Sequence, residues 1–466
     1  MTPKTSTGPA RHRGIASVLA VVLLVVFVTL GAAMFAVSDM GLLVSENLND
    51  RAEARLAAES GLAFMVSSLH KIRLPLSTDA DNFPANLSDC LGDLLDGTAN
   101  LDGQTVAATA DGAAVPTIAL NDGRAFTAQI AWVDATCCHM TIEGTAGNAT
   151  HAVSIDLAME ARNPLVFDYG LASRGELLIG GSVEVAGVDW PGEAHVFSAD
   201  TSAQYPITVE GSGAYVSGDL YVTQGDGAIS IGGQPTIGGT SDPAEIADHL
   251  HYDAHPPDFP ELDTAPLEAL ATTVVDASTD TSQQGQTYNN IRIAAGTNPT
   301  FANDTLVNGI VYVEAPNVVS FEGSCTLNGM VVTENNDLPL EDCRLRFAGT
   351  ATVSGVEALP DTAEFADVRQ HTGTFLLAPG FEAVFEGNLQ TINGAIAADR
   401  LAFGGNASGR INGSVVGLAD LPSEIKGSVS IRIDRTTSEA DHAGFQKSIA
   451  LEPVADTYCE PTPTAQ

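Results

Sequence analysis

The residues from Gly14 to Leu74 constrain this chain more than any other stretch. They begin with an uncharged apolar run, GIASVLAVVLLVVFVTLGAAMFAVS, and continue without a proline or a cluster of turn residues as far as Pro75. About 20 apolar residues, rising about 1.5 Å each, are enough to cross the hydrocarbon core of a bilayer. The sequence therefore predicts one helix over residues 14–74, with its first half in the membrane and its second half outside.

The short segment before the span, residues 1–13, is a basic leader. It carries Lys4, Arg11 and Arg13 and no acidic residue. Positive residues beside a span favour the cytoplasmic side, so we expect a cytoplasmic N-terminus and a periplasmic or extracellular C-terminal part. A cleaved secretory signal would have an apolar core of only about 7 to 15 residues. The longer run favours a retained, single-pass span in the cytoplasmic membrane.

Beyond Ser38 the helical pattern becomes amphipathic. Apolar residues recur in two series, Val44, Leu48, Ala52 and Leu56, then Leu62, Met65, Leu69 and Ile72. Spacing of three and four residues places each series on one face of a helix, and such a stripe must pack on something. The partner is either the chain's own globular domain or a neighbouring copy in a filament.

The charge of the chain excludes some classes of partner. It has 58 acidic and 20 basic residues, a net charge of -38. Such a surface repels nucleic acid, so we expect no nucleic-acid partner. Apolar residues make up 44% of the 466 residues, which is enough to build cores. Domains usually hold about 100 to 200 residues, so two or three units are expected.

Residues 75–163 predict a small β-rich domain. The chain is rich in turn residues over 75–103. From Gln104 onward, short alternating segments are separated by Asp-Gly and Gly-Asn turns, and the clearest are RAFTAQIAWV, CHMTIEGTA and HAVSIDLAME. Alternation of this kind is typical of strands with one buried face.

An internal repeat follows. Four apolar-Asn-Gly corners share one pattern: Asn308-Gly309, Asn328-Gly329, Asn393-Gly394 and Asn412-Gly413. A period near 20 residues is typical of a β-solenoid, and Asn and Gly tolerate the left-handed backbone of a corner. We expect a right-handed parallel β-helix in two parts, 164–239 and 287–437, so the fold class is α+β, mainly β. A stack of antiparallel hairpins is the alternative, but it would show alternating polar faces.

Two segments lie outside this repeat: a long loop excursion over residues 240–286, and a polar tail over residues 438–466 that we expect to be flexible. Five side chains of the excursion could ligate a transition metal: Asp248, His249, His251, Asp253 and His255. Solvated loop histidines are the competing interpretation. The sequence does not decide between them, and no metal site is predicted.

The six cysteines do not form the paired CxxC motifs of a zinc ribbon. In an exported domain disulfides can form, and Cys325 with Cys343 is the first candidate pair. Two unpaired buried thiols are the alternative.

Many β-helices act on polysaccharides, and glycoside cleavage needs two carboxylates about 5 to 10 Å apart. Glu322 and Glu386 follow phenylalanines at the corners and are the candidates, with solvated corner acids as the plainer interpretation. No G-x-S-x-G, P-loop or H-E-x-x-H motif occurs. We therefore predict no catalytic residue, no cofactor and no enzyme activity.

The N-terminal residues resemble those of the type IV pilin superfamily, and most of all its PilX-type minor pilins. The resemblance covers about residues 11–66: the Arg13-Gly14 junction, the apolar span and the stretch NLNDRAEARLAAESGLA. It implies cleavage by a prepilin peptidase between Gly14 and Ile15. It also implies that other pilins or pseudopilins bind through the N-terminal helix.

One position departs from the pilin pattern. Pilins commonly carry Glu as the fifth mature residue, and Leu19 stands there. In a filament that carboxylate would neutralise a neighbour's terminal amine, a charge that is costly to leave alone in lipid. The K-type pseudopilin of type II secretion, a large tip subunit, is similar in lacking this acid. The resemblance therefore implies a structural subunit of a pilus or a secretion pseudopilus, at a tip or initiating position, whose head has an unidentified surface or glycan ligand. The alternative is a membrane-anchored β-helix that binds or cleaves carbohydrate.

Overall fold

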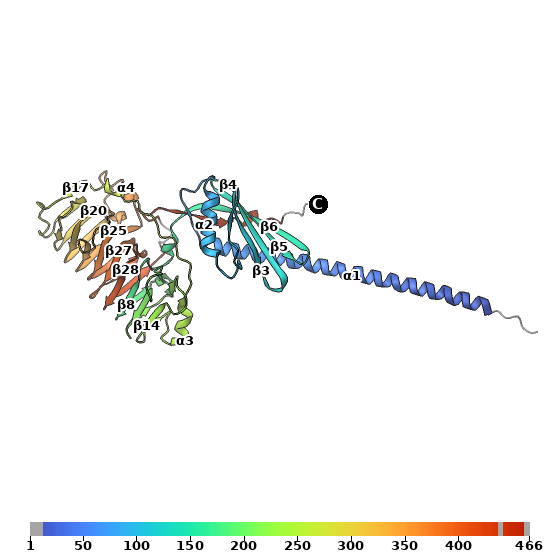
Figure 1. Cartoon of the computed structure of the whole chain (residues 1–466). Coiled ribbons are helices and arrows are strands. Elements are labelled where there is room, and N and C mark those ends of the chain that lie inside the picture. The colour runs from blue at the N-terminus through green and yellow to red at the C-terminus, as the bar shows by residue number, and fades with distance from the viewer. Residues whose placement is uncertain (1–12, 437–440, 461–466) are drawn as a thin grey trace, which may run out of the picture. The chain divides into compact units, whose positions relative to one another are not determined.

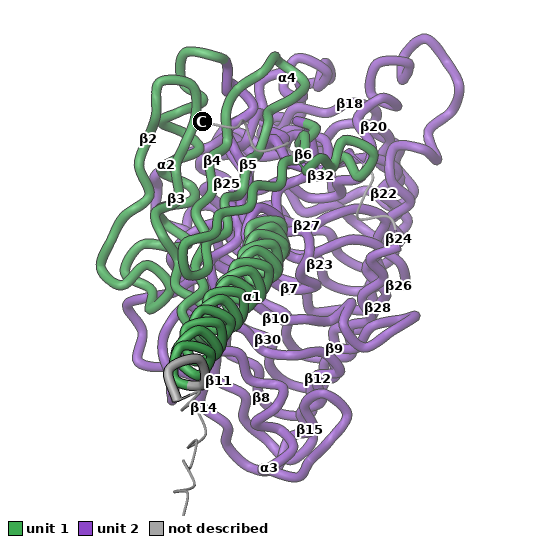
Figure 2. Tube along the Cα trace, turned by 90° about the vertical axis from the view of Figure 1, so that its right-hand side faces the viewer, with its two compact units in different colours: residues 1–67, 80–158, 453–466 green, residues 68–79, 159–452 purple. Residues whose placement is uncertain are grey.

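A computed structural model describes residues 13–436 and 441–460 of the chain. A long apolar N-terminal helix precedes a large β-rich part, as predicted (Figure 1). The chain forms two compact units, coloured separately in Figure 2. Unit 1 contains residues 1–67, 80–158 and 453–466, and unit 2 contains residues 68–79 and 159–452.

The helix α1 (Arg13–Leu69) is continuous over 57 residues. It has no break at Gly61, and it ends five residues before the predicted Leu74. The amide of Lys71 donates to the carbonyl of Ser68, which closes a tight turn, and Leu74 then enters strand β1 (Leu74–Pro75). The prediction of one long helix is confirmed apart from this last turn.

Unit 1 contains an antiparallel sheet in the order β6, β5, β4, β3, β2. Its strands are β2 (Ala107–Ala108), β3 (Gly112–Ala119), β4 (Arg124–Asp134), β5 (Cys137–Ala146) and β6 (Ala149–Arg162). Helix α2 (Phe83–Leu95) occupies part of the segment 75–103 that was predicted to be rich in turns. It forms because Phe83, Leu87, Leu91 and Leu95 repeat at helical spacing and are all buried.

Small residues bring α1 close to the sheet of unit 1. Ala54, Ala57, Ala58 and Met65 are completely buried along one face of the helix. A Cβ atom built on Gly144 of β5 would lie 2.2 Å from the carbonyl oxygen of Ala54 and 2.3 Å from the amide nitrogen of Ala58. The approach of helix to strand therefore depends on the absence of a side chain at residue 144.

Unit 2 is built around a large sheet whose strand pairs are parallel. The first strands are β7 (Leu171–Ser173), β8 (Leu177–Gly181), β9 (Glu184–Gly187), β10 (Val196–Ser198), β11 (Ile207–Glu210), β12 (Tyr215–Val216), β13 (Leu220–Val222), β14 (Ile229–Gly232), β15 (Thr236–Ile237) and β16 (Leu250–His251). Each of β7 to β13 pairs with the strand three places later. The antiparallel-hairpin alternative is therefore wrong for this sheet.

The later strands continue the same parallel sheet. They are β17 (Thr273–Val275), β18 (Thr287–Ile293), β19 (Thr300–Phe301), β20 (Thr305–Val313), β21 (Asn317–Phe321), β22 (Ser324–Thr333), β23 (Cys343–Phe347), β24 (Thr350–Val353), β25 (Thr374–Phe385), β26 (Asn388–Asn393), β27 (Ala395–Phe403), β28 (Ser408–Asn412), β29 (Val415–Gly417), β30 (Ser423–Gly427) and β31 (Ser430–Asp434). The last three pair with β7, β8 and β9. The chain thus enters the sheet at its middle.

The excursion over residues 240–286 connects the two ends of this sheet. β14 and β17 lie toward opposite ends of the sheet, with β28 and β8 between them (Figure 1). The segment is only partly the predicted loop. It contains β16, β17 and two short helices, α3 (Pro243–Ile246) and α4 (Ala265–Glu268).

A ladder of phenylalanine rings runs through the later strands. Its rings belong to Phe301, Phe321, Phe347, Phe385 and Phe403, and neighbouring centroids lie 5.0, 5.2, 5.0 and 4.7 Å apart. The planes of neighbouring rings differ by at most 14°. Four of the five rings begin Phe-x-Gly corners of the sequence, at Phe321, Phe347, Phe385 and Phe403. The parallel register places each of these residues opposite the next, which aligns the rings.

The tail contains a strand, so the prediction of a flexible tail is wrong for its described residues. β32 (Ser448–Pro453) pairs antiparallel with β1 in unit 2. Further on, the backbones of Cys459 and Ser154 form an antiparallel bridge in unit 1. Ile449 and Leu451 give the strand a buried face. Residues 438–440 and 461–466 of the predicted tail, like most of the basic leader, lie outside the described residues.

Candidate functional site

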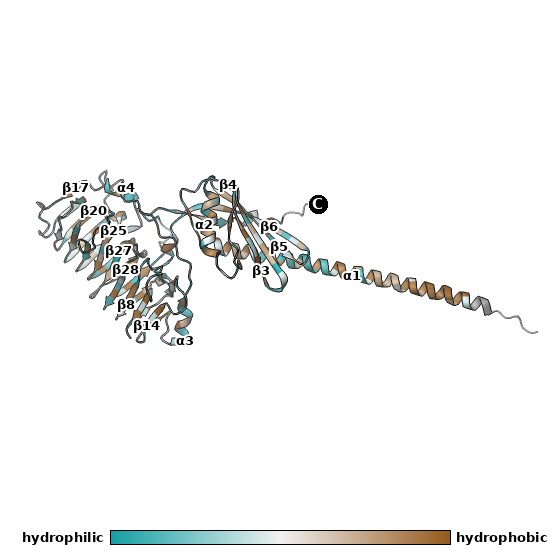
Figure 3. Cartoon of the chain, in the orientation of Figure 1, coloured by the Kyte–Doolittle hydropathy of each residue, from teal (hydrophilic) through white to brown (hydrophobic). Residues whose placement is uncertain are grey.

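The first half of α1 is a candidate membrane span. Among the described residues, the helix from Ser17 to Leu69 is the one that is long and apolar enough to cross a membrane. Its first half is the continuous hydrophobic segment of the helix in Figure 3. Side chains from Val18 to Val44, including Leu19, are exposed in the isolated chain. Exposed apolar surface of this extent needs lipid or another protein to cover it.

The two apolar series of α1 have different surroundings. Val44, Leu48 and Leu56 remain 56%, 60% and 47% exposed, whereas Met65 and Leu69 are at most 1% exposed. Packing on the chain's own globular domain, one of the two predicted alternatives, is therefore right for the second series and wrong for the first. The exposed series Val44, Leu48, Ala52 and Leu56 is called the free stripe below. It lies on the same rigid helix as the residues that anchor α1 to unit 1.

The two predicted processing residues, Gly14 and Ile15, belong to the first turn of α1. Cleavage between them stays a prediction.

The two predicted disulfide partners, Cys325 and Cys343, are buried and form no disulfide. The thiol of Cys325 lies 3.3 Å from the carbonyl oxygen of Glu322, and the thiol of Cys343 lies 3.5 Å from the amide oxygen of Asn336. Cys325 aligns with Thr305 and Cys343 aligns with Asn317, on different strands. The thiols therefore occupy different corners, and the alternative of two unpaired buried thiols describes them.

The candidate carboxylate pair belongs to a network of ion pairs. Glu322 and Glu386 both pair with Arg346, at 3.5 and 2.6 Å. The carboxylate of Glu382 is buried and lies 2.5 Å from Nε of Arg344. Carboxylates held by guanidinium groups in this way tie adjacent strands together.

Two of the excursion histidines hold a single carboxylate. Nδ1 of His249 lies 2.7 Å from one oxygen of Asp219, and Nε2 of His251 lies 3.2 Å from the other. The ring of His251 stacks on Tyr221 at 4.4 Å, and Nδ1 of His195 accepts from the amide of Asp219. Asp219 thereby fastens residues 249–251 of the excursion to β13, and Asp253 and His255 line a cavity that His251 also lines. The arrangement is a hydrogen-bonded fastening rather than a set of converging metal ligands.

Asp219 should make the stability of unit 2 depend on pH. Burial raises its pKa, but hydrogen bonds from His249 and His251 outweigh burial, so the pKa lies below its ordinary value. A lowered carboxyl pKa stabilises the fold above the unfolded pKa of about 3.9, and this stabilisation is lost as the pH falls through the folded value. We expect Asp219→Asn to destabilise unit 2 by about 1 to 2 kcal/mol at pH 7, and by less near pH 3.

Thermal unfolding at both pH values measures this difference. Burial also lowers the pKa of His195, and the Asp219 carboxylate partly opposes this shift, so His195 belongs to the pH dependence that the substitution changes. Asp420→Asn, at an exposed position of unit 2, is the control. A loss at pH 3 as large as that at pH 7 would contradict the role given to the Asp219 carboxylate.

Three carboxylates, Asp189, Glu193 and Asp434, lie close enough to share a cation. Glu193 accepts hydrogen bonds from the amides of Asp189 and Arg435, at 2.8 and 3.2 Å. Asp434 accepts from the amide and hydroxyl of Thr436. These donors account for the cluster as a hydrogen-bonded corner.

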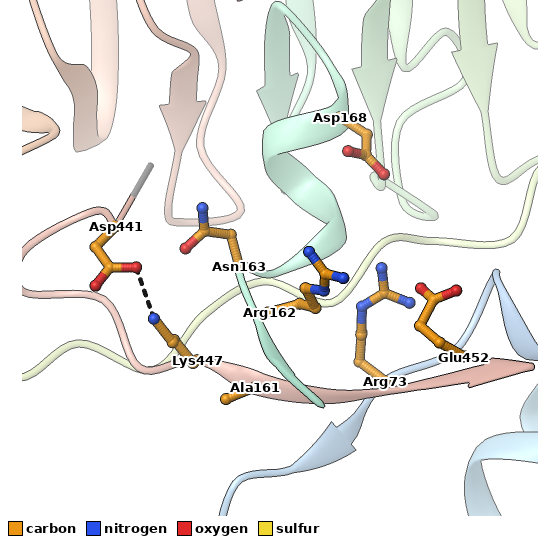
Figure 4. Close-up of a pocket in the computed structure, with 8 residues that line it drawn as sticks. All are labelled: Arg73, Ala161, Arg162, Asn163, Asp168, Asp441, Lys447 and Glu452. Atoms are coloured by element: carbon orange, nitrogen blue, oxygen red, sulfur yellow. Dashed lines mark ion pairs between the residues drawn. The ribbon is translucent and has the colours of Figure 1, made fainter. Parts of the chain in front are cut away.

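A polar pocket of about 370 Å³ lies within unit 2 (Figure 4). Three basic residues line it: Arg73 before β1, Arg162 at the end of β6, and Lys447 before β32. Figure 4 shows Asn163 and the guanidinium of Arg162 between Lys447 and Arg73. The sequence analysis missed this pocket, because its basic residues come from three distant segments. The sequence feature that could have drawn attention to these three residues is that basic residues are scarce in the chain.

Comparisons with known proteins assign no family to the chain. No family model matches its sequence, and no curated protein does. Among solved structures, the competence-associated pilin ComZ from Thermus thermophilus is 13% identical, and the alignment covers 89% of this chain and 97% of that one. The TM-score is 0.26, which does not establish a shared fold.

Proposed function

We propose that the chain is a membrane-anchored, pilin-like subunit of a type IV pilus or a secretion pseudopilus. The first half of α1 spans the cytoplasmic membrane after cleavage at Gly14-Ile15 and packs among other pilins or pseudopilins. Unit 2, called the head below, lies outside the membrane, and its parallel sheet follows the path of a right-handed β-helix. The absence of an acid at Leu19 favours a position at the filament tip rather than within the shaft.

One observation carries this proposal. The free stripe continues the exposed apolar span outward, beyond the length that a bilayer covers, while the opposite small-residue face of α1 is buried against unit 1. A helix that only anchored a head would need no apolar stripe outside lipid, since polar residues would be better solvated there. A neighbouring helix in a filament would cover the free stripe, because the side-chain ridges of one helix pack into the grooves of another.

The carbohydrate-cleaving alternative has less support. The two carboxylates that motivated it, Glu322 and Glu386, are both engaged by Arg346. Arg346 occupies carboxylate oxygens that a general acid would have to present to a substrate. We propose that these residues stabilise the head and that the protein is not an enzyme.

Covalent capture tests the proposal. A photo-crosslinking amino acid in place of Leu56, in cells that assemble the filament, should yield adducts with other filament subunits because the free stripe faces them. The same group at Val133, 56% exposed on β4, is the matched control and should yield few. Mass spectrometry of the same preparation should find Ile15 as the mature N-terminus. Equal adducts at both positions, or an uncleaved leader, would refute the assembly role.

A further inference from the structure

A second cavity of unit 2 is rich in aromatic rings. Its volume is about 370 Å³, within the usual range of about 300 to 1,000 Å³ for small-molecule sites. Three of the eight tyrosines of the chain line it, Tyr169, Tyr221 and Tyr252, together with the ring of His251. Apolar walls with a few polar groups are the usual form of a ligand site. The lining belongs wholly to unit 2.

Three of these rings form a wall whose position is fixed. Tyr221 stacks on His251, with centroids 4.4 Å apart, and meets the ring of Tyr169 edge to face at 5.5 Å. Both Nε2 of His251 and the hydroxyl of Tyr221 lie within hydrogen-bonding distance of the Asp219 carboxylate, at 3.2 and 3.4 Å. Rings held in this way lose little conformational entropy when a ligand covers them. A ligand would therefore meet a preorganised apolar surface.

The hydroxyl of Tyr169 makes no hydrogen bond within the described part of the chain. The side chain is half-buried, and burial raises the pKa of Tyr169, so the hydroxyl stays protonated and can donate. Its oxygen is not completely enclosed by the described residues, so a ligand can reach it. A hydrogen bond to a half-buried group is electrostatically stronger than one in bulk water.

Charged groups of both signs line the cavity, which disfavours a charged ligand. They are the carboxylates of Asp168 and Asp253 and the ammonium of Lys71. Asp168 is already attracted to Arg73 and Arg435, so it is not counted as a ligand contact. Asp253 and Lys71 are exposed, and a ligand hydroxyl can donate to the first and accept from the second. A neutral ligand with several hydroxyls fits both, whereas an ion is repelled by one of them.

We propose that this cavity binds a neutral sugar in its pyranose form. A pyranose has C–H bonds on its faces and hydroxyls around its edge, and C–H groups of slight positive charge pack well on the negative face of an aromatic ring. The sugar face lies on the ring wall, Tyr169 donates to one hydroxyl, and Lys71 and Asp253 contact others. This inference goes beyond filament assembly, because the free stripe takes no part in the cavity. A failure of either proposal therefore leaves the other standing.

Saturation-transfer NMR titrations of the full-length protein test the site, in a polyoxyethylene detergent that carries no sugar. The probes are the methyl glycosides of glucose, galactose, mannose and N-acetylglucosamine. Sorbitol is the reference, because it has the hydroxyls but no ring face. At least one glycoside should bind about fivefold or more tightly than sorbitol, through contact with the ring wall. Glucosamine and glucuronate should bind no more tightly than that glycoside, because each meets a like charge.

Tyr169→Phe removes only the hydroxyl, so it should weaken sugar binding about fivefold through loss of one hydrogen bond. The midpoint of thermal unfolding should stay unchanged, because no partner within the described residues is lost. Tyr215→Phe is the matched control, the same change at a half-buried tyrosine of unit 2 that does not line the cavity. Its effect on binding should stay within about twofold.

Tyr252→Leu keeps apolar bulk but removes a ring, and it should weaken binding about fivefold or more. The proposal is overturned if no glycoside binds better than sorbitol, or if a charged analogue binds more tightly than every neutral glycoside. It is also overturned if Tyr215→Phe weakens binding as much as Tyr169→Phe does.

Discussion

Substituting valine for Gly144 should destabilise unit 1 by about 3 kcal/mol. The added Cβ would meet two backbone atoms of α1, the oxygen of Ala54 and the nitrogen of Ala58, and neither can rotate away as a side chain would. Either β5 or the whole helix must shift. The backbone of Gly144 is not left-handed, so the penalty comes from this contact rather than from strain in φ.

Hydrogen exchange measures the effect, because it resolves the peptides of α1 and β5 from those of unit 2. Exchange should accelerate in both elements of unit 1 and stay unchanged in the Phe ladder. Gly41→Ala is the matched control: Gly41 is exposed on α1 with nothing within 4 Å of an added Cβ. Alanine favours a helix over glycine by up to about 1 kcal/mol, so this change should be neutral or stabilising. Wild-type exchange in the valine variant would show that α1 and β5 do not depend on this approach.

The packing of α1 shows where sequence reasoning succeeds and where it misleads. The length and apolarity of the helix are local properties, so they could be predicted. Which face is buried could not, because the largest apolar residues, such as Leu48 and Leu56, are exposed while Ala54, Ala57 and Ala58 are buried. Close approach to a strand selects small side chains, and a pattern that weighs hydrophobicity alone overlooks them. The larger apolar residues, Leu48 and Leu56, therefore stay exposed and can contact another molecule.

The parallel sheet was predictable from its corners but its order was not. The repeated Phe-x-Gly corners indicate rings in register, and the rings do stack. That β29 returns beside β7, with Val415 opposite Leu171, depends on a contact between residues far apart in the chain. Neither strand carries a local signal of its neighbour.

The same limit hid the tail strand and the polar pocket. β32 forms beside β1, a strand of two residues whose sequence, Leu74–Pro75, carries no strand signal. Once these strands pair, Arg73 and Lys447 are brought to one cavity with Arg162. Candidate residues that lie together in sequence, such as His249 and His251, were easier to notice but hold a structural carboxylate instead.

The Phe ladder connects five strands of unit 2, and Phe347 is its centre. Its ring stacks on Phe321 at 5.2 Å and on Phe385 at 5.0 Å, and it is 1% exposed. Phe347→Ala should lower the free energy of unfolding of unit 2 by about 3 to 5 kcal/mol, because it removes buried apolar surface and leaves a cavity. Three aromatic contacts, to Phe321, Phe375 and Phe385, each worth about 0.5 to 1.5 kcal/mol, are lost as well.

Guanidinium chloride unfolding, followed by hydrogen exchange in β21, β23 and β25, measures this loss. Phe403→Ala is the informative comparison, because the ring of Phe403 is the last of the ladder and stacks only on Phe385 within it, at 4.7 Å. The loss of stability at Phe403 should therefore be smaller by about two aromatic contacts. Equal losses at both positions would mean that each ring contributes through burial alone. A loss under about 1 kcal/mol at Phe347 would mean that neighbouring strands collapse into the space, and the ladder would then not be what holds the head together.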